Sequence, residues 1–130
     1  MSHQRIRSGG EFEPKAGYCR AVVTEDGWVH VAGTVGVDHA TGHLPDDVTE
    51  QCANALRIIA VALEQAGARM ADVVRVHYIL PERADFEPCW PQLRAAFGDA
   101  PPAATMIQAG LLDAAMKIEI EVTAKIPAQG

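Results

Sequence analysis

The stretch that decides the fold is Lys117-Ile118-Glu119-Ile120-Glu121-Val122-Thr123, near the end of the 130-residue chain. Its apolar residues alternate strictly with polar ones, which is the period-two pattern of a strand with one buried face. The polar face carries two glutamates, although carboxylates have low strand propensity and repel one another when they stack. We expect either a solvated outer face or a glutamate that lies in a cleft with an altered proton affinity.

Five further segments are predicted to be strands from their apolar and β-branched residues and from the Gly and Pro residues that bound them. The turn Glu25-Asp26-Gly27 joins two of them as a hairpin. Segment 11–17 contains Pro14 and Gly17, so we expect a loop there. The strands are predicted at residues 4–8, 18–24, 28–32, 71–80, 104–109 and, last, 116–125.

Two helices are predicted between the strands. The first begins after the capping residue Asp47 and ends at Gly67. The second runs from Asp85 to Phe97, with a kink or a late start, because Pro91 would remove a backbone hydrogen bond. Apolar residues of the first helix recur at three- and four-residue spacings and form one stripe that must be buried: Val48, Cys52, Ala55, Leu56, Ile59 and Leu63.

The element order β-β-β-α-β-α-β-β predicts an α+β fold in which two helices cover one face of a sheet of about six strands. We assign a set of apolar and β-branched residues to the uncovered face: Val29, Val31, Val74, Val76, Thr105 and Ile107. Such a face needs a partner, and further copies of the chain are the simplest one. We therefore expect residues 1–130 to form one domain that self-associates.

The composition excludes several classes of protein. The formal net charge is −6 and the sequence has no basic stripe, so nucleic acid is not an expected partner. No apolar run approaches the roughly 20 residues that span a bilayer, and the N-terminus lacks the apolar core of a signal peptide. Cys19, Cys52 and Cys89 have no CxxC spacing and suit a reducing compartment. We expect a cytoplasmic protein with no membrane partner.

A set of short motifs runs in collinear order through nearly the whole chain. They are Gly17-Tyr18, Val31-Ala32-Gly33-Thr34, Thr41-Gly42-His43-Leu44-Pro45, Gln51, Gly67, Asp72-Val73-Val74, Asp85-Phe86, Phe97, Pro102-Ala103 and Ile118-Glu119-Ile120-Glu121. None of these motifs is specific alone, but their joint order resembles the reactive-intermediate deaminase family, also called Rid or YjgF.

The resemblance implies a chorismate-mutase-like protomer with a six-stranded mixed sheet. It implies that three protomers pack into a trimeric barrel and form clefts between subunits. The best-known members hydrolyse enamine or imine intermediates, such as those from serine and threonine dehydration, to a 2-keto acid and ammonia without a cofactor. In them an arginine clamps the substrate carboxylate, a glutamate positions or protonates the substrate, and a backbone carbonyl holds the attacking water.

Two side chains of that site are retained in this sequence. The glutamate corresponds to Glu119, which would act as a general acid or base, or alternatively would serve as a hydrogen-bonding group between subunits. The tyrosine corresponds to Tyr18, which would stack on a planar substrate or form part of the rim. The carbonyl position falls near Met106, and Gly33 and Thr105 are expected to line the same cleft.

Three polar positions of the site are apolar here: a serine is replaced by Ala32, an asparagine by Trp90 and the arginine by Ala104. A bidentate arginine–carboxylate contact is worth a few kcal/mol and fixes orientation. Ordinary 2-imino acids are therefore expected to bind weakly and to align poorly with water. The cleft suits an aromatic or uncharged ligand. Arg20 is expected to be a solvated surface residue, with replacement of the lost cation as the alternative.

Two functions remain open from the sequence. One is a homotrimer that binds a small molecule and hydrolyses an imine or enamine, or tautomerises a small planar substrate, with Glu119 and no cofactor. The other is a non-catalytic trimer that binds a metabolite or acts in regulation. Some relatives are described as ribonucleases, but the acidic charge counts against that activity. No metal is expected, because His39 and His43 lack a third ligand at usable spacing.

Overall fold

The structure is a computed structural model that describes residues 3–128, which form six strands, three α-helices and three short 3-10 turns. The strands are β1 (Gln4–Ile6), β2 (Ala21–Val23), β3 (Trp28–Val35), β4 (Val73–Leu80), β5 (Ala103–Gln108) and β6 (Glu119–Lys125). The α-helices are α1 (Phe12–Ala16), α2 (Val48–Ala66) and α3 (Trp90–Phe97). Short 3-10 turns are η1 (Met70–Asp72), η2 (Arg83–Asp85) and η3 (Glu87–Cys89).

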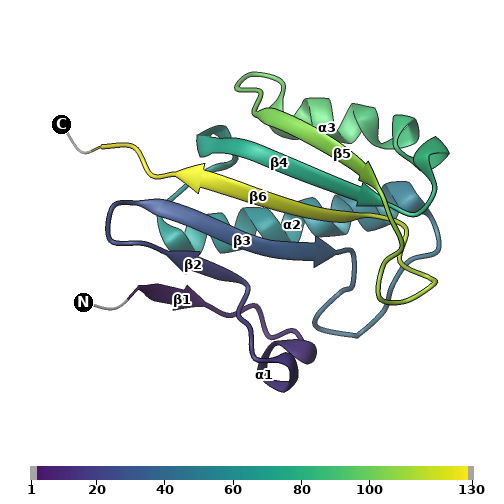
Figure 1. Cartoon of the computed structure of the whole chain (residues 1–130), viewed down its shortest axis with the longest axis horizontal. Coiled ribbons are helices and arrows are strands. Elements are labelled where there is room, and N and C mark those ends of the chain that lie inside the picture. Colours follow the sequence, from purple (N-terminus) through teal and green to yellow (C-terminus); the bar gives the residue numbers. More distant parts are fainter. Residues whose placement is uncertain (1–2, 129–130) are drawn as a thin grey trace.

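The six strands form one mixed sheet in the order β1-β2-β3-β6-β4-β5 (Figure 1). Neighbouring strands are antiparallel except β4 and β5, which run parallel. The last strand, β6, lies in the interior of the sheet between β3 and β4. The predicted α+β fold with a six-stranded mixed sheet is therefore confirmed.

Helices α2 and α3 lie on the same side of the sheet (Figure 1). The Asp47 side chain accepts a hydrogen bond from the Thr49 amide at 3.0 Å, and Gly67 ends α2 in the left-handed conformation with φ 86°. All six residues of the predicted α2 stripe are buried, as are Ile118, Ile120 and Val122 at β6. The alternation in β6 thus places its apolar side chains toward α2 and its glutamates on the opposite face.

The helix-free face is more polar than the sequence led us to expect. Val29, Val31 and Val76 are at most 2 % exposed and belong to the core, so their assignment to the open face was wrong. Val74 and Ile107 are each 44 % exposed. The reason is strand periodicity: residues paired across strands share a face, and the neighbours of these core valines carry the polar groups, among them His30, Arg75, His77, Glu121 and Thr123.

The predicted loop at residues 11–17 is instead helix α1. Pro14 lies within the first turn, where a missing amide donor costs little, and Gly17 ends the helix with φ 77°. Glu13 is 2 % exposed and points away from solvent. Pro14 and Gly17, which suggested a loop, therefore lie in the first turn and at the end of a short helix. The buried Glu13 carboxylate fixes the orientation of this helix.

The strand boundaries differ from the prediction at two functionally important points. Strand β3 continues to Val35 and contains a bulge after Val31. Strand β6 begins at Glu119 rather than at Met116, because the preceding segment is tied to α2. The buried Gln51 side chain donates to the Ala115 carbonyl at 3.0 Å and accepts from the Lys117 amide at 2.9 Å. The predicted late start of the second long helix is confirmed, since α3 begins at Trp90 after η3.

Replacing Gly36 by Ala should lower the free energy of unfolding by about 1–3 kcal/mol, because a Cβ there would overlap the α2 backbone at Gln51. Gly110→Ala is the matched control, since a Cβ at Gly110 would meet nothing within 4 Å. The control should stay within about 1 kcal/mol of the wild type. Urea unfolding at one fixed protein concentration measures both variants. Equal stability of the two variants would show that β3 and α2 are not in close contact at Gly36.

Candidate functional site

Glu119 is the first residue of β6, where the sheet register pairs it with Val35 of β3 and Ile79 of β4. Its side chain is half-buried and lies against Gly33, since a Cβ built on Gly33 would be 2.5 Å from the Glu119 Oε2 atom. A residue with a side chain at Gly33 would displace the carboxyl group. The absence of a Cβ is therefore what allows Glu119 to occupy this position.

The pKa of Glu119 is raised above its ordinary value. Burial is the largest cause, and the negative charge of Glu121 adds to it, while the positive charge of Arg20 acts in the opposite direction. A carboxyl group of this kind keeps its proton to higher pH than an exposed glutamate. A carboxyl group with a raised pKa is a candidate general acid or base.

Ala32 and Gly33 form the β3 bulge beside Glu119. The register pairs Val31 with Val122 and Thr34 with Ile120, so two residues of β3 oppose Glu121 alone. Both bulge residues are partly exposed. The bulge therefore changes the direction of the backbone at Ala32 and Gly33, which correspond to the family's serine and glycine positions.

Tyr18 follows α1 directly, and its amide donates to the Glu13 carbonyl at 2.9 Å. Tyr18 is 39 % exposed. Tyr18 and Ala32 line a hollow of about 1210 Å³ on the helix-free face of the sheet, which His30, Glu121 and Thr123 also line. This region can therefore offer a planar ring and several polar groups to a bound molecule.

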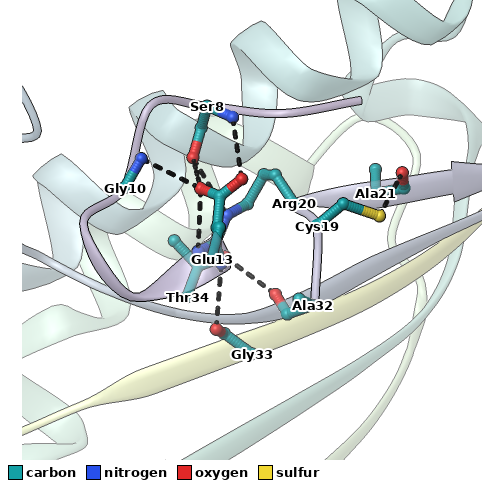
Figure 2. A network of polar contacts seen from close by, with 9 residues as sticks. All are labelled: Ser8, Gly10, Glu13, Cys19, Arg20, Ala21, Ala32, Gly33 and Thr34. Atoms are coloured by element: carbon teal, nitrogen blue, oxygen red, sulfur yellow. Dashed lines mark hydrogen bonds and ion pairs between the residues drawn. The ribbon is translucent and has the colours of Figure 1, made fainter. Parts of the chain in front are cut away.

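Glu13 and Arg20 form a buried ion pair (Figure 2). The Glu13 carboxylate accepts hydrogen bonds from the Ser8 hydroxyl, from the Ser8 amide at 3.2 Å and from the Gly10 amide at 3.1 Å. Its Oε2 atom is 3.6 Å from Nη2 of Arg20. Burial alone would raise the pKa of Glu13, but these hydrogen bonds and the Arg20 charge outweigh it and hold the pKa below its ordinary value.

The expectation that Arg20 is a solvated surface residue was wrong, because Arg20 is 4 % exposed. Its guanidinium donates from Nη1 to the Gly33 carbonyl and to the Thr34 hydroxyl, both at 3.0 Å, and from Nε to Ser8 Oγ at 3.3 Å. No sequence pattern indicated that the Glu13 carboxylate contacts this arginine.

The other predicted cleft residues lie at the opposite edge of the sheet. A slot of about 290 Å³ lies between α3 and β5, where Trp90 and Ala104 line it together with apolar side chains and Arg94. Trp90 is 43 % exposed and contacts Phe86 edge-on, with 6.1 Å between ring centroids. Met106 is 38 % exposed on the same strand as Ala104.

The sheet register shows that these two groups of residues face opposite ways. Ala104 pairs with Val76 and Met106 with Tyr78, whose side chains face the helices. Glu119 is on the other face, and so is Thr105, which pairs with His77. Within one chain, Gly33 lies against Glu119, while Tyr18 and Ala32 line the hollow that Glu121 also lines. Ala104 and Met106 are on the helix side of the sheet, where Trp90 and Ala104 line the slot beside α3.

Sequence reasoning missed two pairs of side chains. His77 Nδ1 lies 3.0 Å from Glu121 Oε1 across β4 and β6. Cys52 and Cys89, which the sequence spacing did not connect, interact in the core, and this interaction together with burial raises the pKa of Cys52. Both thiols are completely buried. A facing position in neighbouring strands could have suggested the first pair, whereas the second depends on how η3 packs on α2.

Within residues 3–128, no three His, Cys, Asp or Glu side chains are grouped so that they could hold a metal ion. In the same part of the chain, no helix has the length and hydrophobicity needed to cross a bilayer.

The fold and the site together define a chorismate-mutase-like α+β protein of the kind found in the YjgF structures. The chain belongs to the Endoribonuclease L-PSP family, the YjgF or Rid family, whose model matches residues 9–126. It is 31 % identical over 122 residues to a 2-iminobutanoate/2-iminopropanoate deaminase of Capra hircus, covering 93 % of this chain and 89 % of that one. A RutC family protein of Pyrococcus abyssi is 30 % identical, covering 86 % of this chain and 88 % of the relative.

Solved structures agree with this assignment. A member of the YjgF/YER057c/UK114 family from Mycobacterium tuberculosis is 36 % identical and superposes with a TM-score of 0.85, covering 95 % of this chain and 99 % of that one. The YjgF gene product of E. coli, at 24 % identity, shares the fold with a TM-score of 0.82 over 94 % of this chain and 98 % of its own. The resemblance read from the sequence is thus confirmed at the level of family and fold.

Replacing Glu119 by Gln should raise the unfolding midpoint of the protein, and the gain should grow as pH rises. Burial raises the folded-state pKa of Glu119 above its ordinary value of 4.5, so the folded protein holds this proton more tightly than the unfolded chain. The stability that this provides is complete below the unfolded pKa and is lost as pH rises through the folded pKa. The glutamine variant has no such loss.

Calorimetric scans of both proteins from pH 4 to pH 8, in roughly unit steps across the range where carboxyl groups titrate, test this expectation. Glu82→Gln is the control because Glu82 is an exposed residue ahead of η2. A difference between Glu119→Gln and the wild type that stays constant over the whole range would contradict the raised pKa.

Proposed function

We propose that this protein binds a small planar molecule between subunits and uses Glu119 to hydrolyse its C=N bond or to tautomerise it. The observation that carries the proposal is the half-buried Glu119 carboxyl, which has a raised pKa and lies against Gly33. A proton-handling group in a partly dry position is what imine hydrolysis and enamine tautomerisation both need.

The hydrolysis can be written with its atoms balanced. Water adds to the imine carbon, a proton passes to the nitrogen, and the resulting amino alcohol loses ammonia to leave a carbonyl compound. Glu119 would give the proton to nitrogen and take one from the attacking water. Tyr18, which is 39 % exposed, would stack on the planar C=N system.

The names of the relatives support this reaction class. Several curated relatives are 2-iminobutanoate/2-iminopropanoate deaminases, including the Capra hircus protein and a Bos taurus protein that is 31 % identical. Their named substrates carry a carboxylate beside the imine. In this chain Ala104 stands where the family's carboxylate-clamping arginine is expected. We therefore propose a substrate whose recognised part is apolar or aromatic rather than a short 2-imino acid.

The slot beside α3 is the second support for this substrate class. Its lining is largely apolar and includes the Trp90 ring, with Arg94 as the charged member. Apolar and aromatic walls favour ligands of the same character. Arg94 would reach only an anionic group carried at a distance from the reacting bond.

The two halves of the proposed site require more than one subunit. Glu119 and Ala104 lie on opposite faces of the sheet of one chain. A complete site would therefore combine Glu119, Tyr18 and Gly33 of one subunit with Trp90, Ala104 and the Met106 carbonyl of another. We propose a homotrimer of single-domain chains, because the family resemblance implies three clefts formed in this way.

A non-catalytic ligand-binding trimer is the second candidate. The observation that favours it is the set of apolar residues at three positions where the family has polar ones: Ala32, Trp90 and Ala104. Such a cleft could bind a metabolite without aligning water for attack.

Ammonia release from matched imines tests the proposed reaction. Wild-type protein is expected to accelerate the hydrolysis of acetophenone imine more than that of 2-iminobutanoate generated in situ. Ala104→Arg should improve 2-iminobutanoate hydrolysis by at most about 2 kcal/mol, or roughly thirtyfold in kcat/KM, because it restores a charge-assisted contact. The same change should weaken turnover of the aryl imine by placing a cation in an apolar slot.

Glu119→Gln is the control for chemistry and Arg94→Gln is the control for a substitute cation. If no imine is turned over but acetophenone imine or its ketone still binds, the non-catalytic candidate replaces the enzyme. Wild-type turnover of 2-iminobutanoate that falls in Arg94→Gln would show that Arg94 clamps the carboxylate, and the apolar substrate class would then be wrong.

The oligomeric state is a separate expectation. Multi-angle light scattering at micromolar concentration should give three times the 13.9 kDa chain mass. A mixture of two inactive variants, Glu119→Gln and one carrying a bulky substitution at Ala104, should regain part of the activity when subunits exchange, because some clefts would then combine two intact halves. A monomeric mass would remove the shared cleft from the proposal.

A further inference from the structure

Arg20 contacts three segments of the chain: the N-terminal segment with β1, helix α1 and the β3 bulge. Its amide donates to the Ile6 carbonyl of β1 at 2.8 Å, and its carbonyl accepts from the Ala32 amide of β3 at 2.8 Å. Its guanidinium reaches Ser8, Glu13, Gly33 and Thr34 (Figure 2). Backbone and side chain of one residue thus hold both the N-terminal strand and the β3 bulge.

The bulge is the part of β3 that regular pairing does not hold. Ala32 and Gly33 have no register partners, because β3 has one residue too many between Val31 and Thr34. Arg20 supplies the missing bonds: its carbonyl takes the Ala32 amide and its Nη1 donates to the Gly33 carbonyl at 3.0 Å. The Thr34 hydroxyl, which accepts from Arg20, donates in turn to the Ala32 carbonyl at 2.8 Å.

Gly33 is also the residue against which the Glu119 carboxyl lies. The position of Gly33 therefore sets the position of Glu119, and Arg20 sets the position of Gly33. On its other side, the Arg20 guanidinium carbon is 5.6 Å from the centre of the Tyr18 ring. Two side chains of the candidate site accordingly depend on one buried arginine.

We propose that Arg20 is a positioning residue of the candidate site, which holds the β3 bulge under the Glu119 carboxyl and the Tyr18 ring beside it. The inference rests on the proposed role of Glu119. It also assigns Arg20 a role other than clamping a substrate carboxylate, because its donors are directed to Gly33, Thr34, Ser8 and Glu13 inside the protein. The Glu13 carboxylate neutralises its charge.

The electrostatic surroundings of Glu119 give this proposal a sharp test. Glu121 on the same strand raises the pKa of Glu119 and Arg20 lowers it. The register neighbours on the flanking strands, Val35 and Ile79, carry no charge. A change at Arg20 and a change at Glu13 should therefore act on Glu119 in opposite directions.

The experiment is an NMR titration of the Glu119 side-chain carboxyl in deuterated, full-length protein, with the signal assigned by its loss in Glu119→Gln. Arg20→Met removes the nearby cation, so the pKa of Glu119 should rise. Glu13→Gln leaves the cation without its counter-ion, so the pKa of Glu119 should fall. Arg57→Met, an exposed arginine on α2, is the matched control and should leave this titration unchanged.

Arg20→Lys separates positioning from charge. Lysine keeps the positive charge but has one nitrogen, so it cannot contact Ser8, Glu13 and the Gly33–Thr34 pair at once as the three guanidinium nitrogens do. The Gly33 amide signal and the Tyr18 ring signals should shift away from their wild-type positions, while the pKa of Glu119 stays below that of Arg20→Met. A group needed merely for folding would loosen the region in every variant, expose Glu119 to water and move its pKa downward each time.

Two results would overturn the proposal. One is a pKa of Glu119 that moves in the same direction in Arg20→Met and Glu13→Gln. The other is an Arg20→Lys protein whose Gly33 and Tyr18 signals match the wild type. If Arg20→Met does not fold, Glu13→Gln and Arg20→Lys, which both keep the cation, decide the question: a raised pKa in Glu13→Gln would overturn it.

The test needs no substrate, so its failure is distinct from failure of the proposed reaction. If the pKa of Glu119 moves in the expected directions but no imine is turned over, Arg20 remains the positioning residue of a binding site. The proposed enzymatic activity is then wrong. Turnover that depends on Glu119 together with titrations in the wrong directions would keep the enzyme and remove Arg20 from its machinery.

Discussion

The buried ion pair between Glu13 and Arg20 is the interaction on which the arrangement of the site depends. Both residues are at most 4 % exposed. Moving two charges out of water costs several kcal/mol each, and their attraction offsets this only when other hydrogen bonds fill the remaining capacity. Here groups from residues 8–10 and from β3 fill it. The N-terminal segment, α1, β2 and the β3 bulge therefore form one interdependent unit.

The strict alternation of β6 is the second constraint, and it divides the molecule into two faces. Ile120 and Val122 must face α2, so Glu119 and Glu121 must face away from it. In the parallel pairing of β4 with β5, Ala104 falls on the helix side with Val76. The Glu119 carboxyl and the apolar slot are thus on opposite faces of the sheet of one chain, and in the proposed function the meeting of two chains would bring them together.

The parts of the structure that local sequence patterns specify were predicted well, and the parts that depend on contacts distant in sequence were not. Helix α2 has a capping residue, a stripe and a terminal glycine, and all three are in place. Helix α1 was missed because Pro14 and Gly17 are common both in loops and at the ends of helices. The contact that decides between the two, from Glu13 to Arg20, spans seven residues. The open face was misassigned because alternation gives the period of a strand but not which of its faces meets the helices.

Glu119 matches the family's glutamate although other positions of the family's site have changed, and the structure offers an explanation. The support of Glu119 comes from Gly33 and, through it, from Arg20, all within one chain and on the helix-free face. The residues that would select a ligand, Trp90 and Ala104, belong to a slot on the other face and share no hydrogen bond with that support among the described residues. Substitutions in the slot can therefore change what is bound without moving the carboxyl group, because couplings are weak between sites that share no partners. Under the proposed function, a chain with this arrangement would lose the clamp for one class of imine and keep Glu119 as the group that handles the proton.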